Sequence, residues 1–482
     1  MSSKPISPET FWLSVRDINA KLIANEFSCE DLTKAAAERL ERLGPKYNAL
    51  AHPLTKIAVK RAKEIDKELR RGRTRGPLQG VAYGAKDLLS FGGEPTRWGA
   101  KPFETQKFED HATAILRLDK LGAICVGKLG MVELAGGGGY RYPAASLTGP
   151  GLNPWDITRW SGGSSSGSGS AVAAGLVPYA LGSETWGSIL TPAAYCGVTG
   201  HRPTYGLVSR HGAMALSWTL DKIGPMCRSA VDCGIVLQAI AGGDSADPGS
   251  AGKSFYYAPQ FIRPNAEIRV GFAPADLDLI VDEEVRKTFT ATYEAFRQLG
   301  FPMKEVALPE MPYSAAASTI IACEASSIFE ELIASGKVDQ LADQNQIQGL
   351  KASFDYSARD YLKAMRVRAL AQEMFRKLFE DVDVLLAPSR INIASKLTDP
   401  LDKPAGITRE SVTMKNRGLR DLSAAGNLAG LPALSLPCGF VQGMPLGMSV
   451  ISRPFQDSLV LTVGVRYQEK SDWHKRRPPG TE

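Results

Sequence analysis

The chain has 482 residues, of which 44% are hydrophobic and 22% charged, a composition typical of a soluble globular protein with a sizeable core. Its net charge of +6 is spread along the sequence, and the dense basic cluster at residues 70–75 ends a predicted helix, where cations suit the helix dipole. This pattern argues against a nucleic-acid partner. The longest uncharged apolar run, residues 171–182, is too short to span a bilayer, so no membrane association is expected.

The cysteines and the first residues of the chain bear on its compartment. The seven cysteines form no CxxC pair and mostly lie in apolar runs such as residues 123–126, which is typical of buried thiols in a reducing compartment. The N-terminal residues lack the apolar stretch of a secretory signal. We therefore expect a cytoplasmic protein. No HExxH motif or clustered Cys/His spacing indicates a metal site.

Residues 1–75 are predicted to be helical. Their N-capping serines and apolar residues at helical spacing indicate three helices: residues 7–22, Ser28 to the stop signal Gly44-Pro45, and about Thr55 to Leu69. Such a set of helices more often packs on a larger domain than folds alone.

From Leu78 onward, short apolar runs alternate with helical patterns. Strands are expected at residues 79–87, 123–128, 177–181, 268–272, 382–388, 427–439 and 448–452. Helices are expected at residues 111–121, 168–175, 282–299, 315–335 and 357–380, with another beginning at 131–135. This alternation predicts an α/β protein with a large mixed, mainly parallel sheet covered by helices on both faces. Since no repeat, low-complexity linker or charge block marks a boundary, residues 1–482 are expected to form one domain.

Two serine-bearing turns, at residues 162–168 and 183–188, are joined by a segment of small uncharged residues. The second turn delivers Ser188 to the start of a short helix, where backbone N–H groups have no intrahelical partner. The N–H groups of this turn are therefore candidates to bind an oxyanion, namely those of Thr185, Trp186, Gly187 and Ser188. Taken alone, Ser188 is better explained as an N-capping serine.

Three matches change that interpretation. Residues 162–168 and 183–193 resemble the glycine- and serine-rich signature of the amidase signature family, and residues 80–87 are similar to the segment that carries the family's catalytic lysine. The spacing of Ser164 and Ser188 is also like that of the family's two catalytic serines. The resemblance covers nearly the whole chain. It implies the amidase signature fold, with residues 77–245 as the signature core and residues 310–420 as a helical part facing the substrate.

The resemblance also implies roles for three side chains: Ser188 as nucleophile, Ser164 as a bridging serine after a cis peptide bond at Gly163, and Lys86 as base. A lysine accepts a proton readily only if desolvation lowers its pKa from about 10.4 towards about 7–8, and Lys86 follows the uncharged residues 81–85. Acyl transfer through an acyl-enzyme on Ser188 would then cleave an amide, carbamate or anilide. This chemistry needs no metal or organic cofactor.

The same stretch departs from the family pattern at four positions: Ser166 and Trp186 replace glycines, Glu184 an aspartate and Leu190 an arginine. Without an arginine at position 190, Glu184 needs another partner. The Trp186 side chain either covers the acyl site or fills core, and the sequence leaves both open. Further candidates for the substrate pocket are Gly136, Gly137, Gly138 and Tyr140, because glycines let backbone approach a ligand closely.

Other functions fit parts of the same sequence. Residues 163–167 match the G-x-S-x-G nucleophile elbow, with Ser165 as nucleophile and Asp221 and His474 following in order, although residues 153–161 are predicted to be turn-like rather than the strand that an elbow requires. Some relatives of the family are amidase subunits of transfer-RNA-dependent amidotransferases, which need partner subunits. A non-catalytic scaffold is a third interpretation. We expect a small amide-type molecule as partner, and the oligomeric state, a homodimer included, stays open.

Overall fold

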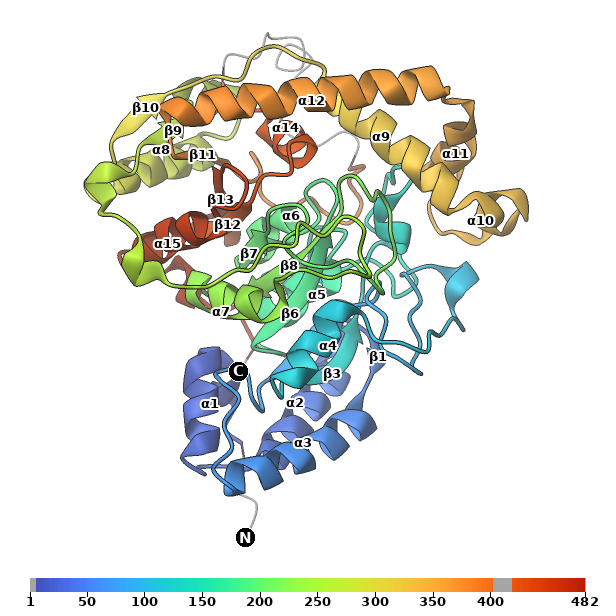
Figure 1. Ribbon diagram of the computed structural model, residues 1–482, viewed down its shortest axis with the longest axis vertical. Helices are drawn as coiled ribbons and strands as arrows, with labels where there is room; N and C mark the ends of the chain where they lie inside the picture. Colours follow the sequence, from blue (N-terminus) through green and yellow to red (C-terminus); the bar gives the residue numbers. More distant parts are fainter. Residues whose placement is uncertain (1–5, 402–417, 482) are drawn as a thin grey trace.

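The computed structural model describes residues 6–401 and 418–481 (Figure 1). Within these residues one sheet holds eleven strands in the order β1-β3-β2-β6-β8-β7-β12-β13-β11-β9-β10. These strands are β1 (Leu50–Pro53), β2 (Ala82–Lys86), β3 (Ile124–Leu129), β6 (Tyr179–Glu184), β7 (Thr199–Arg202), β8 (Lys222–Cys227), β9 (Val270–Phe272), β10 (Met303–Glu305), β11 (Val384–Pro388), β12 (Ala433–Val441) and β13 (Met444–Ser452). A separate hairpin consists of β4 (Leu152–Asn153) and β5 (Asp156–Trp160).

Helices lie on both faces of this sheet (Figure 1). In the described residues they are α1 (Val15–Ile23), α2 (Cys29–Leu43), α3 (Thr55–Arg70), α4 (Thr113–Lys120), α5 (Ser166–Ala173), α6 (Leu190–Cys196), α7 (Ala230–Ile240), α8 (Glu283–Gln298), α9 (Tyr313–Ile328), α10 (Glu330–Ala334), α11 (Gln344–Ala352), α12 (Ala358–Asp381), α14 (Leu422–Leu428) and α15 (Asp457–Gln468). The short helices α5 and α6 pack together against the sheet, and α7 and α15 form another such pair. The predicted α/β fold with a large mixed sheet is thus confirmed.

Antiparallel pairing takes up more of the sheet than the sequence predicts. The strands β3, β2 and β6 are parallel, as are β11, β9 and β10. Between them, neighbouring strands from β6 to β11 run antiparallel. The reason is connectivity, because β12 and β13 are joined by a tight turn and no helix separates β7 from β8. A parallel pair needs a long crossover, whereas an antiparallel pair needs only a turn.

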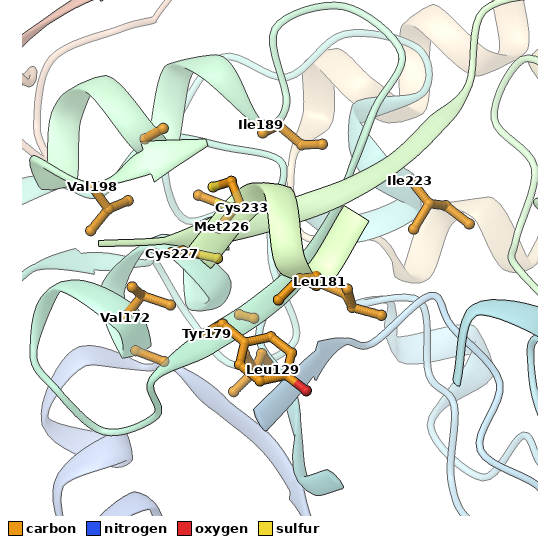
Figure 2. Packing of buried hydrophobic residues seen from close by; sticks show 14 of the residues in the cluster. Leu129, Val172, Tyr179, Leu181, Ile189, Val198, Ile223, Met226, Cys227 and Cys233 are labelled. Carbon is orange, nitrogen blue, oxygen red and sulfur yellow. The ribbon is translucent and has the colours of Figure 1, made fainter. Parts of the chain in front are cut away.

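The middle of the sheet is packed on both sides. Tyr179 and Leu181 of β6 and Met226 of β8 belong to the main hydrophobic cluster, together with Val172 of α5 and Cys233 of α7 (Figure 2). Strands buried on both faces read as nearly continuous apolar runs, which is why β2 and β6 are recognisable in the sequence. This packing holds the ends of β2 and β6, where the polar site residues begin.

The N-terminal helices are confirmed in part. Ser28 caps α2, and α3 begins at Thr55 as expected. The helix predicted for residues 7–22 is divided into a 3-10 turn (Pro8–Trp12) and α1, because Ser7 and Ser14 each cap a separate start. Residues 50–53 were not expected to be a strand, yet β1 pairs with β3 at the edge of the sheet. Four residues that include His52 and Pro53 carry too little strand signal to be noticed.

Four other expectations differ from the structure. Residues 133–136 make a 3-10 turn with Leu134 and Ala135 in left-handed conformation, rather than a helix start. Residues 427–429 close α14 instead of opening a strand, and the helix predicted for residues 315–335 is broken into α9 and α10. The segment 153–161, predicted to be turn-like, carries the β4–β5 hairpin. The first three of these segments are apolar enough to fit more than one element, so tertiary contacts decide.

The helices α9, α11, α12 and α14 form a second packed group, and α12 runs along α9 across the top of Figure 1. Apolar side chains of α9, α12 and α14 belong to a second cluster, which also contains Leu190 from the start of α6 and, at its margin, Trp186, whereas Ile347 and Leu350 of α11 belong to the main cluster. These helices lie in or next to the predicted helical part 310–420, of which residues 402–417 fall outside the described residues. None of the helices in residues 6–401 and 418–481 is long and apolar enough to cross a membrane.

Candidate active site

Lys86 is the last residue of β2, a strand that is buried along its whole length between β3 and β6. Its side chain is 0% exposed. The Nζ atom donates hydrogen bonds to Ser164 Oγ at 2.7 Å and to the Oγ atoms of Ser165 and Ser183, each at 3.0 Å. Burial lowers the pKa of Lys86 to about 7, against the opposing influence of Asp221 and Glu184. Near neutral pH, this amine is therefore able to accept a proton.

The residue after Lys86 contacts a different group, as strand alternation predicts. Asp87 is buried and forms an ion pair with Lys128 of β3, with Oδ1 and Nζ 3.0 Å apart. This pair neutralises the second charged residue at the end of β2. Lys86 itself has no carboxylate within salt-bridge distance among the described residues.

The first serine turn leads into α5. The peptide bond between Gly163 and Ser164 is cis, the geometry that the resemblance implies. Ser165 Oγ donates to the carbonyl of Ser183 at 3.1 Å and accepts from the Ser183 N–H at 3.2 Å. The Ser165 N–H donates to the carbonyl of Ser188 at 3.2 Å. The two serine turns, distant in the chain by one helix and one strand, are thus hydrogen-bonded to each other.

The second serine turn connects β6 to α6. Gly187 has a φ of +83°, a conformation that favours glycine. The backbone N–H groups of the four predicted oxyanion residues, Thr185 to Ser188, have no hydrogen-bond partner within the described residues. The Ser188 hydroxyl likewise makes no hydrogen bond to the described part of the chain and is 7% exposed. The turn therefore presents unused donors and one unused hydroxyl.

The side chain of Glu184 stabilises the end of this turn through hydrogen bonds to its backbone. Its Oε2 accepts hydrogen bonds from the N–H groups of Ile189 and Leu190, at 2.9 and 3.0 Å. Its Oε1 accepts from Arg202 Nη1 at 2.9 Å and from Asn427 Nδ2 at 3.1 Å. Burial alone would raise the pKa of Glu184, but the Arg202 and Lys222 charges outweigh it and bring the pKa to about 2. Arg202 on β7 is thus the partner that Glu184 lacks at position 190.

A cavity of about 270 Å³ opens onto this turn. Ser188, Thr185, Trp186, Gly136 and Tyr140 are among its lining residues. Trp186 both lines this cavity and packs at the margin of the second apolar cluster. A second cavity, of about 370 Å³, shares Arg390 with the first.

Two predicted pocket residues are not among the residues that line the first cavity. Gly137 packs on Leu216, where a Cβ would lie 2.9 Å from Leu216 Cδ1. Gly138 packs on α11, where a Cβ would lie 2.5 Å from the carbonyl oxygen of Gln346. Close packing on backbone therefore requires glycine at 138, whereas the neighbour of Gly137 is the end of a flexible side chain, and a glycine run in the sequence does not distinguish either case from ligand contact.

The geometry disfavours Ser165 as a nucleophile. The Ser165 side chain is fully buried, and both its proton and its lone pairs are engaged with Ser183 and Lys86. All five histidines lie within the described residues, and none lines the 270 Å³ cavity. Asp221 accepts from Thr185 Oγ1 at 2.6 Å instead of orienting a histidine. Among the described residues, no group of His, Cys, Asp and Glu could hold a metal ion.

Sequence analysis missed several members of the site. Ser183, Arg202 and Asn427 were not singled out, and their roles depend on contacts between β6, β7 and α14. Arg390, which lines both cavities, also escaped notice. No motif marks Arg202, Asn427 or Arg390, because their partners are brought in by the folding of separate segments, whereas Ser183 lies within the signature stretch 183–193.

The fold and this site define an α/β enzyme of the hydrolase class, with a buried lysine against paired serine turns. The family model described as Amidase matches residues 31–461, and the chain belongs to this amidase family. It is accordingly an amidase that acts on carbon–nitrogen bonds.

Relatives named as amidotransferase subunits are similar along their whole length. The chain is 34% identical over 490 residues to a glutamyl-tRNA(Gln) amidotransferase subunit of Gloeothece citriformis, covering 97% of this chain and 99% of the relative. It is 33% identical over 491 residues to the protein of the same name from Methylococcus capsulatus, with coverage of 97% and 99%.

Solved structures give the same fold. Native peptide amidase from Stenotrophomonas maltophilia superposes with a TM-score of 0.81 at 29% identity, covering 97% of this chain and 98% of that one. A glutamyl-tRNA(Gln) amidotransferase subunit from Thermotoga maritima has a TM-score of 0.78 at 27% identity, with coverage of 98% and 99%. A chain from a vestigial protein complex that bears on the origins of an s-triazine catabolic enzyme has a TM-score of 0.85 at 28% identity, with coverage of 95% and 99%.

Proposed function

We propose that the protein hydrolyses small amides through an acyl-enzyme on Ser188, with Lys86 as the base and Ser164 as the proton bridge between them. One observation carries the proposal: the buried Lys86 Nζ, with a pKa of about 7, lies 2.7 Å from Ser164 Oγ. The Ser164 turn is itself bonded to the Ser188 turn through the Ser165 N–H.

The hydrogen bonds of Lys86 support a relay through Ser164. The three hydrogen bonds that Lys86 Nζ donates are those of the ammonium form; neutral Lys86 has two N–H bonds and one lone pair, so one of the three hydroxyls must then donate to it. Ser165 cannot be this donor, because its proton is directed at the Ser183 carbonyl. Ser164, the nearest of the three at 2.7 Å, is the neighbour best placed to donate. A Ser164 that has given its proton to Lys86 can take the proton of Ser188.

The turn at residues 183–188 then supplies the nucleophile and the N–H donors for the reaction. Ser188 Oγ attacks the carbonyl carbon of the amide while its proton passes through Ser164 to Lys86. The free N–H groups of Thr185 to Ser188 are the donors available to the negative oxygen of the tetrahedral intermediate. The proton returns along the same route to the leaving nitrogen, so an amine or ammonia departs. Water, activated by the same relay, cleaves the acyl-enzyme and releases the acid.

A fluorophosphonate probe tests this proposal directly. The wild-type protein should be labelled on Ser188, and Ser188→Ala should not be labelled. Lys86→Met should label at least about 100-fold more slowly, in line with the usual contribution of a general base. His474→Ala serves as a control, because His474 lies in a 3-10 turn (Trp473–Lys475) and does not line the cavity. Labelling of Ser165, or loss of labelling in His474→Ala, would favour the elbow mechanism instead.

A second candidate function is that of an amidase subunit in a transfer-RNA-dependent amidotransferase. Its support is the 34% identity to a chain of that name along its whole length. Trp186 and Leu190 depart from the family pattern within the catalytic turn, which favours an independent amidase. We therefore propose that residues 1–482 act as one domain on a small amide, without nucleic acid. Amide hydrolysis by the purified chain alone supports this, whereas activity only with added partner subunits supports the amidotransferase.

A further inference from the structure

The described residues that line the 270 Å³ cavity at Ser188 are almost all uncharged. These residues are Ala135, Gly136, Tyr140, Trp160, Gly163, Thr185, Trp186, Ser188, Thr191, Leu216, Ile321, Arg390 and Leu401. Among the described residues that line the cavity, Arg390 is the only charged side chain. The described part of the cavity beside the nucleophile is therefore neutral or apolar except for one guanidinium.

Arg390 is held in place by the sheet. The strand β11 ends at Pro388, and Arg390 lies two residues further on. The N–H of the intervening Ser389 donates to the carbonyl of Gly447 at 2.8 Å. The Ser389 hydroxyl is hydrogen-bonded to those of Ser435 and Ser449, at 2.9 and 2.8 Å. These contacts tie the backbone before Arg390 to β12 and β13. Arg390 thus lies just beyond β11 on backbone that is hydrogen-bonded to the sheet, which suits a binding residue.

The contacts of the Arg390 side chain leave most of its donors unused. Its Nε donates to the Tyr195 hydroxyl over a long 3.4 Å, and its guanidinium lies 5.9 Å from the centre of the Tyr195 ring. No carboxylate of the described residues forms an ion pair with it. Other arginines with little exposure differ in this respect: Arg202 is paired with Glu184 and Arg210 with Asp247, whereas Arg39 donates to the carbonyl groups of Gly175 and Thr481.

A half-buried guanidinium with no counter-ion is costly, and it favours a site where an anion binds. The planar fork of arginine matches a carboxylate with two parallel hydrogen bonds. Arg390 lines both cavities, and the second is also lined by the charged residues Arg202, Asp276, Arg420 and Asp421. A volume of about 270 Å³ is at the small end for ligand pockets, so the molecule itself is small.

We propose that Arg390 binds a carboxylate on the substrate, so that the enzyme selects small amides that carry a carboxylate away from the bond to be cleaved. This inference rests on the proposed hydrolysis at Ser188. It names the substrate class that the hydrolysis alone leaves open, since amides of every charge pass through the same tetrahedral chemistry.

Two amides of equal carbon number test the preference. Succinamate carries a terminal carboxylate, and butanamide has a methyl group in its place. The wild type should show a kcat/KM for succinamate about 10- to 100-fold above that for butanamide, the usual range for a hydrogen-bonded charge. Arg390→Met should abolish this ratio through KM, and Arg390→Lys should keep part of it. Arg376→Met is the matched control, because Arg376 is an exposed arginine of α12 whose partners are Glu373 and Glu380.

Protection of Ser188 from a fluorophosphonate gives a second measurement that needs no turnover. Succinamate should slow the labelling of the wild type at concentrations where butanamide does not, and Arg390→Met should lose this difference. Equal treatment of the two amides by the wild type, or an unchanged ratio in Arg390→Met, would overturn the role of Arg390 while Ser188 still reacts. If Ser188 of the wild type does not react with the probe at all, the hydrolytic mechanism itself is wrong.

Discussion

In the proposed mechanism, the pKa of Lys86 controls the pH dependence of the reaction, and its consequence can be worked out in numbers. With a pKa of about 7, the neutral fraction of Lys86 rises from roughly 9% at pH 6 to roughly 91% at pH 8. The rate of Ser188 labelling by a fluorophosphonate should follow this fraction. It should therefore increase about 10-fold between pH 6 and pH 8 and then level off.

The measurement is a pH series of labelling rates, corrected for the intrinsic hydrolysis of the probe. A lysine at its ordinary pKa of 10.5 would give a different curve, with a rise of about 100-fold from pH 6 to pH 8 and no plateau below pH 9. A curve of that second kind would refute the argument that burial prepares Lys86 as a base.

The same pKa has a consequence for stability. Between about pH 7 and pH 10.5 the unfolded chain holds a proton on Lys86 that the folded protein has released. The unfolded state then binds more protons, so the free energy of unfolding rises with pH across this window. From pH 7 to pH 9 the gain is about 2 kcal/mol relative to Lys86→Met, which cannot titrate there. Urea unfolding of both proteins at the two pH values measures it, and parallel changes in both would contradict the shift.

Three further changes probe the surroundings of the nucleophile. Trp186→Gly should enlarge the cavity at Ser188, so that amides with longer acyl chains become the preferred substrates. The measurement is kcat/KM over a series of acyl chain lengths. An unchanged preference would show that Trp186 does not limit the acyl site. Glu184→Gln should lower the free energy of unfolding in urea by about 3–5 kcal/mol, since it leaves the buried Arg202 charge uncompensated. A decrease below about 1 kcal/mol would show that the ion pair is dispensable. Gly138→Ala should lower the unfolding midpoint well below that of Gly139→Ala, because both glycines have positive φ but only the Cβ at 138 meets backbone; equal losses would mean that backbone conformation alone sets the cost.

Much of the site could be predicted because its parts lie in motifs. Lys86, Ser164 and Ser188 stand in short stretches whose local geometry is set by neighbouring residues, such as the buried run before Lys86 and the glycines around both serines. The existence of α5, β6 and α6 follows in the same way. Element boundaries and type are less secure wherever a segment is uniformly apolar, as with residues 427–429, which join a helix although they match a strand equally well.

The sequence by itself determined the family, the α/β class and the three proposed catalytic side chains, because these depend on residues close together in the chain or on a specific resemblance. Only the tertiary structure decided which residues support them. Arg202 reaches Glu184 from β7, and Arg390 reaches the cavity from the end of β11. Charge pairing and cavity shape are properties of segments that meet in space, and no local pattern encodes where a distant strand will end. The charge of the cavity at Ser188 is therefore a tertiary property, although the proposed chemistry at Ser188 is predicted from the sequence.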